Sequence, residues 1–163
     1  MDDVLFPQIP YFNQSSANAP RVRVDAIGVE VVERLPASAT GGAFSIIETT
    51  NQPGFGPPLH RHRETEIFRV LEGSYLYRID ERTFHASEGD LVVTPGNAVH
   101  AFRNITDRPA RQLVMIVPGW DSLALFSELD AAFVHGVLDP DLRDAWCRKW
   151  HCDLLGPPLG PEG

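Results

Sequence analysis

The first two thirds of the chain consist of short apolar runs separated by turn-forming residues. Val22–Val24, Val29–Val31 and Phe44–Ile47 are such runs, and Gly41-Gly42 separates the last two. Short runs rich in β-branched and aromatic residues and bounded by Gly, Pro, Asn or Asp are typical of strands. The same pattern predicts further strands at 59–71, 74–79, 82–86, 90–94, 100–104 and 112–117. Short strands at this spacing indicate a mainly all-β sandwich or barrel.

The pattern changes after residue 118. Ser122 is a suitable N-cap for a helix that Gly136 would end. Apolar residues recur between them at the i, i+3, i+4 spacing of a helix, at Leu125, Phe126, Leu129, Ala132 and Phe133.

A second helix is predicted to begin at Asp139-Pro140 and to end before Gly156-Pro157-Pro158. It would place Leu142, Trp146 and Trp150 on nearly one face. We interpret this apolar stripe as core packing against the barrel rather than as a platform for substrate.

The 163 residues fit one domain. Residues 1–21, which are rich in proline and polar side chains, are expected to form an N-terminal arm. Residues 22–118 are expected to form the barrel. Residues 119–163 are expected to form a helical extension that packs on it.

Composition and charge narrow the choice of partners. The net charge of −8 would repel a nucleic-acid backbone and an anionic membrane, so neither is expected as a partner. No stretch is long and apolar enough to span a bilayer, and the acidic start is unlike a signal peptide, so we expect a cytoplasmic protein. Cys147 and Cys152 are expected to be free thiols.

Three histidines and one glutamate stand out by their spacing. His60 and His62 lie two residues apart, so on a strand both project from one face, and Glu66 has the same parity. His100 comes from a later strand that a barrel can bring alongside. Imidazole and carboxylate ligands suit divalent transition metals, and four protein ligands leave coordination positions open for substrate. The set therefore predicts a reactive metal site rather than a closed structural one.

These residues resemble the two motifs of the cupin superfamily. Gly54–Gly73 matches the first motif, with its glycine, His-x-His, glutamate and second glycine, and Gly89–Asn104 matches the second, with Pro95, His100 and Asn104. One departure is visible, because Asn97 stands where the second motif has glycine. Asn tolerates the left-handed conformation better than most residues, so the turn is expected to survive.

The resemblance implies a double-stranded β-helix, or jelly-roll barrel, with C-terminal helices. It also implies one divalent transition metal (Fe, Mn, Ni, Cu or Zn) held by His60, His62, Glu66 and His100. The segments Pro57–His60, Pro118–Trp120 and Leu154–Leu159 are similar to those of small single-domain cupins related to quercetin 2,3-dioxygenase.

That similarity implies a mononuclear metal-dependent dioxygenase for a small organic substrate, phenols included. Glu66 is the candidate catalytic residue, which either stays a metal ligand or loosens and acts as a base. Two alternatives stay open: a non-redox isomerase, cyclase or lyase, and a non-catalytic small-molecule-binding cupin. The superfamily and the two apolar faces predicted for residues 60–71 also favour a homodimer.

Other residues are assigned by strand parity and spacing. Glu64 is expected either to orient a histidine or to pair with Arg61 or Arg63 at the rim, and His85 is expected at the surface. A second metal site built from His135, Cys147, His151 and Cys152 is disfavoured because the standard cysteine spacing is missing. The substrate pocket is expected to be lined by Phe68, Tyr75, Tyr77, Phe102 and Met115.

Overall fold

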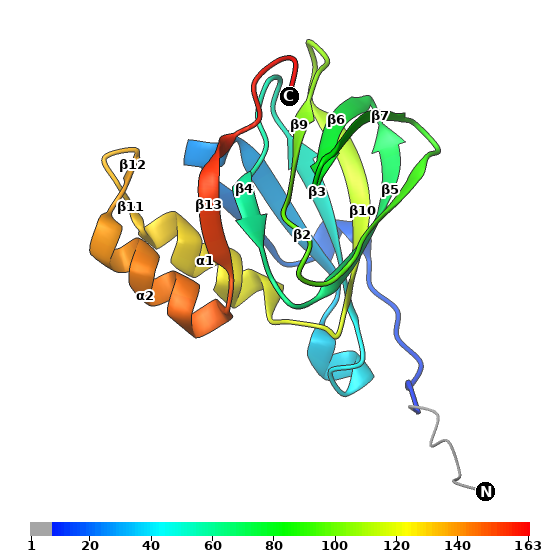
Figure 1. The fold of residues 1–163 in the computed structure, drawn as a ribbon. Coiled ribbons are helices and arrows are strands. Elements are labelled where there is room, and N and C mark those ends of the chain that lie inside the picture. The colour runs from blue at the N-terminus through cyan, green and yellow to red at the C-terminus, as the bar shows by residue number, and fades with distance from the viewer. Residues whose placement is uncertain (1–7) are drawn as a thin grey trace, which may run out of the picture.

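Two antiparallel sheets face each other and close into a barrel, with two helices beside it (Figure 1). The computed structural model describes residues 8–163, so residues 1–7 of the predicted arm lie outside the described part. One sheet has the strand order β1-β2-β3-β10-β5-β8, and the other has the order β13-β4-β9-β6-β7. The expected jelly-roll barrel is confirmed.

The six strands of the first sheet are β1 (Arg21–Val24), β2 (Val29–Leu35), β3 (Ser45–Asn51), β5 (Thr65–Glu72), β8 (Leu91–Thr94) and β10 (Ala110–Val117). The five strands of the second are β4 (Pro58–Arg61), β6 (Ser74–Ile79), β7 (Arg82–Ser87), β9 (His100–Asn104) and β13 (Asp153–Pro158). The remaining elements are the 3-10 turns η1 (Ser16–Asn18), η2 (Asp25–Ile27) and η3 (Ala37–Thr40), the helices α1 (Ser122–Ala131) and α2 (Pro140–Trp150), and the hairpin β11 (Phe133–Val134) and β12 (Val137–Leu138).

The barrel interior is filled by alternate residues of the strands, as the pleat requires. On β5, Glu66, Phe68 and Val70 are buried and their neighbours are more exposed. On β10, the buried set is Ala110, Gln112, Val114 and Ile116. The interior therefore combines an apolar core with a few polar side chains, and the metal-ligand candidates belong to that polar minority.

The first predicted helix is shorter than expected. Its N-cap is Asp121, whose side chain accepts a hydrogen bond from the Ala124 amide at 3.1 Å, and Ser122 is the first helical residue. The helix ends at Ala131, because the next residues form the β11-β12 hairpin around Gly136. The second helix begins as predicted, with Asp139 as N-cap and Pro140 at the first position. Its buried face is narrower than the predicted apolar stripe, because Trp146 is buried but Leu142 is exposed.

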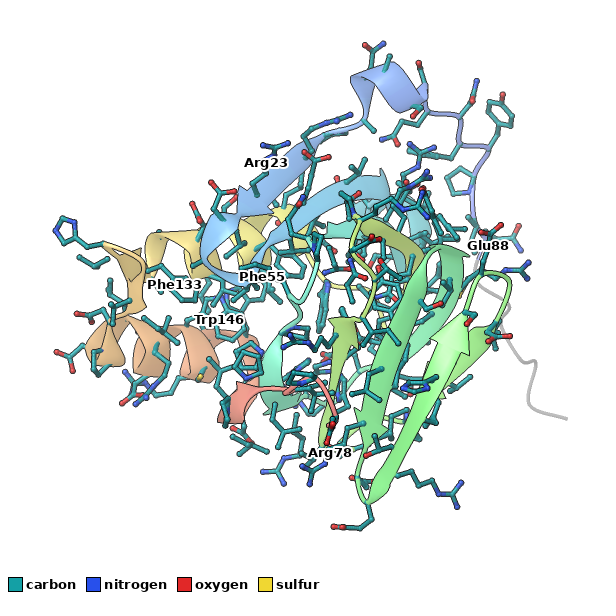
Figure 2. The ribbon with its side chains drawn as sticks, turned by 90° about the horizontal axis from the view of Figure 1, so that it is seen from above. Arg23, Phe55, Arg78, Glu88, Phe133 and Trp146 are labelled. Carbon is teal, nitrogen blue, oxygen red and sulfur yellow. The ribbon has the colours of Figure 1, made fainter. Side chains whose placement is uncertain are left out.

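The C-terminal segment is more than a helical extension. Residues Asp153–Pro158 form β13, which pairs with β4 and completes the five-stranded sheet. Proline is tolerated there because β13 is an edge strand. The predicted boundary at residue 118 is therefore wrong for this strand. Figure 2 shows Trp146 directed from α2 toward the barrel, whereas Arg23 points away from it on β1.

The outer face of the six-stranded sheet keeps apolar side chains that the helices do not cover, because α1 and α2 pack on the inner side with Ile47 and Val114. Leu91 and Val93 are 61% and 49% exposed on this outer face.

Among residues 8–163, no helix combines the length and apolar character needed to cross a bilayer.

A second copy of the chain on this outer face stays a prediction. Light scattering at micromolar concentration is expected to give the mass of two chains. A Val93→Lys variant, which places a charge on the exposed face, is expected to shift the mass toward one chain. A single-chain mass for the parent protein would contradict the homodimer.

Candidate metal centre

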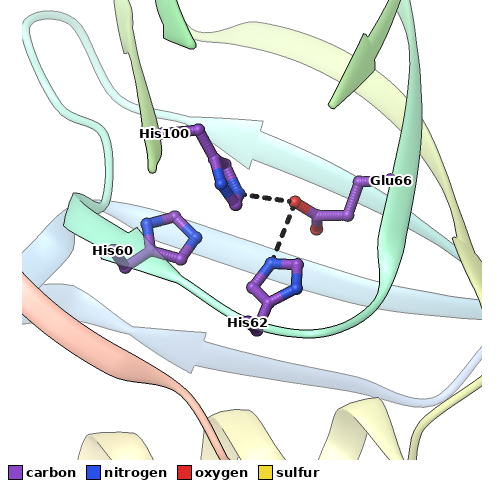
Figure 3. Close-up of side chains that lie close together, drawn as sticks. All are labelled: His60, His62, Glu66 and His100. Carbon is purple, nitrogen blue, oxygen red and sulfur yellow. Dashed lines mark hydrogen bonds and ion pairs between the residues drawn. The ribbon is translucent and has the colours of Figure 1, made fainter. Parts of the chain in front are cut away.

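Four side chains from three strands and one loop meet inside the barrel (Figure 3). His60 comes from β4, Glu66 from β5 and His100 from β9, while His62 lies in the loop between β4 and β5. His60 and His100 are direct cross-strand partners. One ligand atom from each of the four residues lies within 4.8 Å of the others.

The segment that carries His60, His62 and Glu66 is not the uninterrupted strand predicted at 59–71. It breaks between Arg61 and Thr65, and the chain crosses there from the five-stranded sheet to the six-stranded sheet. His62 and Glu66 nevertheless reach the same interior point from opposite sides of the crossing. The predicted convergence is correct, and the predicted strand is wrong.

A neighbouring turn holds the crossing loop in place. Asn97 has a φ of 68°, so it adopts the left-handed conformation expected of it, and its amide donates to the His62 carbonyl at 2.7 Å. A Cβ on Gly96 would lie 2.2 Å from the Arg63 carbonyl oxygen. The glycine therefore allows the turn to approach the histidine loop closely.

Replacing Gly96 by alanine is expected to push this loop away from the turn and to weaken metal affinity by about 10- to 100-fold, as is usual when the support of a ligand is lost. Gly160→Ala is the matched control, because a Cβ there meets nothing within 4 Å. Competition with a chromophoric chelator measures both variants. Equal affinity in the two would show that this close approach does not position His62.

The imidazoles are oriented by groups around them. His60 Nδ1 lies 2.8 Å from the Pro58 carbonyl, and His100 Nδ1 lies 2.9 Å from the Ala98 carbonyl. A ring nitrogen that donates to a carbonyl fixes the tautomer and leaves Nε2 as the acceptor or ligand atom. His100 Nε2 lies 3.0 Å from Glu66 Oε2.

His62 is the histidine of the set whose ring nitrogens lack hydrogen-bond partners. Its Nδ1 lies 3.5 Å from Glu64 Oε2 and its Nε2 lies 3.3 Å from Glu66 Oε2. Both ring nitrogens are buried, and neither has a hydrogen-bond partner among residues 8–163. Buried polar groups without partners are rare in native proteins and point to an ion or water.

Electrostatics favour a neutral His60 beside an ionised Glu66. Burial, together with the neighbouring His100, lowers the pKa of His60 to about 3. Burial also acts to raise the pKa of Glu66, but the close imidazoles of His100 and His62 outweigh it and hold that pKa well below its usual range. Burial acts to lower the pKa of His62, but the nearby carboxylates of Glu66 and Glu64 outweigh burial and raise it.

These observations fit a metal ion. Metal ligands must be neutral imidazole and ionised carboxylate, which are the forms favoured for His60 and Glu66. The unpartnered Nε2 of His62, 3.3 Å from Glu66 Oε2, gives an ion a further donor there. His60, His62, Glu66 and His100 would hold it, and their nitrogen and oxygen donors suit a divalent transition metal.

The other singled-out residues lie elsewhere. Glu64 faces His62 rather than the rim arginines, and Arg61 pairs with Asp153 at 2.8 Å instead. His85 is exposed on β7, as predicted. Within residues 8–163, only the His60, His62, Glu66 and His100 set forms a cluster of three or more potential ligands, so the disfavoured second site has no such cluster.

A cavity of about 90 Å³ adjoins the cluster. Phe68 and Phe102 line it, as predicted from strand parity. Tyr75 and Tyr77 are buried beyond it, where the Tyr75 hydroxyl donates to Asn51 Oδ1 at 3.0 Å and the Tyr77 hydroxyl donates to Gln112 Oε1. Met115 does not line the cavity, because it lies on the opposite face of β10 from Val114.

The C-terminal region contributes a part of the wall that strand parity does not predict. These residues come from the helices, the segment before α1 and the strand β13: Trp120, Leu125, Phe126, Leu129, Trp146 and Leu154. Trp120 also packs edge-on against His62, with ring centroids 5.0 Å apart. The apolar face of the first predicted helix is the feature of the sequence that could have indicated this wall. The interpretation of the tryptophan stripe as core packing holds for Trp146, which is buried and also lines the cavity.

Comparison with known proteins places this geometry in context. Residues 48–116 match the family model described as "Cupin domain". A curated relative, gentisate 1,2-dioxygenase from a Streptomyces species, is 36% identical over 77 residues, which cover 47% of this chain and 20% of that protein. The chain thus spans about a fifth of the length of this relative.

Solved structures share the fold at low identity. A predicted oxalate decarboxylase from Thermotoga maritima superposes with a TM-score of 0.61 and 20% identity, over 66% of this chain and 99% of that one. An RmlC-like cupin from Shewanella frigidimarina superposes with a TM-score of 0.59 and 13% identity, over 72% and 99% of the two chains. At these identities the likeness concerns the barrel alone.

Proposed function

This chain belongs to the cupin superfamily, and on that premise we propose that it is a mononuclear metal-dependent dioxygenase for a small organic substrate. One observation carries the proposal: three imidazoles and one carboxylate converge, and three of these side chains, His60, His62 and Glu66, line an apolar cavity. Ligands that open onto a substrate-sized space are typical of a reactive site rather than a structural one. The partial similarity to a gentisate 1,2-dioxygenase supports the choice of oxygen chemistry.

The four side chains would hold the metal ion, and one of them would also accept a proton. A divalent transition metal bound there would supply Lewis acidity toward a hydroxyl or carbonyl oxygen of the substrate. Glu66 is the only carboxylate among the four donors, and both of its imidazole contacts are made through Oε2. Its Oε1 can therefore accept the proton of a substrate hydroxyl.

The surrounding walls exclude water and orient the substrate. Trp120 lies against His62, and the apolar side chains of α1 cover the cavity from the helical side. A dry wall strengthens the interaction between the substrate oxygen and the charged groups beside it. The same wall would keep a reactive intermediate away from solvent.

The test is oxygen consumption by protein loaded in turn with Fe, Mn, Ni, Cu or Zn. The panel contains catechols, diketones and flavonols, and products are identified by mass spectrometry. Uptake with at least one redox-active metal and a product that contains added oxygen is expected. Product without oxygen uptake would instead favour the non-redox isomerase, cyclase or lyase. A ligand that binds and is recovered unchanged under every metal would favour the non-catalytic binding cupin.

A further inference from the structure

We propose that the cavity beside the metal-ligand cluster selects an uncharged, apolar substrate no larger than a single ring and rejects substrates that carry a carboxylate away from the reacting oxygens. The inference rests on the proposed function, since it takes the cluster as the place where those oxygens bind. It concerns the part of the substrate that does not react. The composition, hydrogen bonding and size of the cavity wall carry it.

Among residues 8–163, the wall has no permanently charged cation. Its members include aliphatic and aromatic side chains from both sheets and both helices, and none is arginine or lysine. Glu66 is the only acidic residue among them. A carboxylate in such a place would be a buried charge without a partner, which is one of the costliest arrangements in a protein interior.

Most neutral polar groups of the wall already have partners among residues 8–163, and the buried Trp120 Nε1 is a donor without one. Asn51 Oδ1 accepts from the hydroxyls of Thr49 at 3.3 Å and of Tyr75 at 3.0 Å. Trp146 Nε1 donates to the Leu125 carbonyl at 3.0 Å. The thiol of Cys152 is neutral, because burial raises its pKa. The walls thus offer a polar substituent few free partners, and they favour an apolar one.

A group of arginines lies on the other side of His62. Arg61, Arg63 and Arg148 line a separate surface groove together with His151 and Asp153. His62 borders both this groove and the cavity. Arg61 is also engaged with Asp153. A substrate held in the cavity therefore meets the imidazole of His62 rather than the guanidinium groups beyond it.

The cavity is small. Its volume of about 90 Å³ is well below the roughly 300–1,000 Å³ of sites that enclose drug-sized ligands. A single ring is the upper limit for such a space, and the three rings of a flavonol exceed it. Gentisate, which names the Streptomyces relative, carries a carboxylate and belongs to the rejected class.

The experiment compares three single-ring compounds by calorimetric titration of the metal-loaded protein at pH 7. Catechol is the apolar compound, 3,4-dihydroxybenzamide adds an uncharged group, and 3,4-dihydroxybenzoate adds a carboxylate of the same size. Catechol is expected to bind at least about 100-fold more tightly than the benzoate, because an unpaired buried charge is that costly. The benzamide is expected to bind at least about 10-fold more tightly than the benzoate, which separates charge from size.

A pair of variants adds the missing cation. Phe126→Arg introduces a guanidinium at the cavity wall and is expected to raise the affinity for 3,4-dihydroxybenzoate at least about 10-fold. Ser127→Arg makes the same charge change one position along α1, on an exposed residue, and is expected to leave that affinity unchanged. Circular dichroism confirms that both variants are folded.

The outcomes separate this inference from the proposed function. Binding of the benzoate as tightly as the benzamide, tight binding of quercetin, or no binding of catechol would each overturn the inference. Selective binding of catechol without oxygen uptake would leave the inference standing and would overturn the dioxygenase proposal.

Discussion

Replacing Glu66 by glutamine is expected to lower turnover by about 100- to 10,000-fold, the usual contribution of a general base, while most of the bound metal is retained. His60, His62 and His100 still provide three imidazoles, and the glutamine side chain has nearly the same volume. The substitution removes the only anionic donor of the four. It also removes the carboxylate that is proposed to accept the substrate proton.

The measurement sets metal content beside dioxygen consumption, using the substrate from the panel that the parent protein turns over fastest. Glu81→Gln is the control, because it makes the same chemical change at an exposed position in the turn between β6 and β7. Turnover in Glu66→Gln equal to that of the control would remove Glu66 from the mechanism.

Replacing His62 by alanine is expected to weaken metal affinity by more than about 100-fold, which is beyond the effect of losing a supporting group. His62 is 3% exposed, so no other side chain or bulk water readily takes its place. The substitution also leaves Glu66 with one imidazole contact in place of two. The neighbouring ligands would then hold an ion less tightly.

His85→Ala is the matched control, since that histidine is exposed on β7. Chelator competition is expected to give the control the affinity of the parent protein. If His62→Ala retained that same affinity, the metal would have to bind elsewhere.

The ligand set could be predicted from the sequence because its spacing reflects a simple geometric constraint. Residues two apart on an extended segment share a face, and this held for His60 and His62 although the strand ends between them. The sequence does not indicate where this strand ends. Polar residues such as Arg61, Arg63 and Glu64 suit both the outer face of a strand and a loop. The support from Gly96 also could not be predicted, since it depends on a contact with the Arg63 carbonyl.

Strand parity failed where both faces of a strand are apolar. On β10, Val114 and Ile116 point inward while Leu113 and Met115 lie on the other face. When both sets of alternating residues are apolar, the alternation does not show which set faces the interior. The prediction that Met115 lines the pocket is wrong for this reason.

The C-terminal region differs from its prediction for another reason. The Gly156-Pro157-Pro158 sequence is a strong stop signal for a helix, but an edge strand accepts it. Only the pairing of β13 with β4 identifies it as part of the barrel.

The most direct test of the metal centre is X-ray absorption spectroscopy of the zinc-loaded protein, combined with elemental analysis. The expected result is about one zinc per chain, with nitrogen and oxygen ligands at about 2.0–2.2 Å, the scattering of several imidazoles, and no sulfur. A sulfur ligand at about 2.3 Å would assign the ion to Cys147 or Cys152. That result, or imidazole scattering that persists in a His60→Ala, His62→Ala, His100→Ala triple variant, would contradict the site formed by His60, His62, Glu66 and His100.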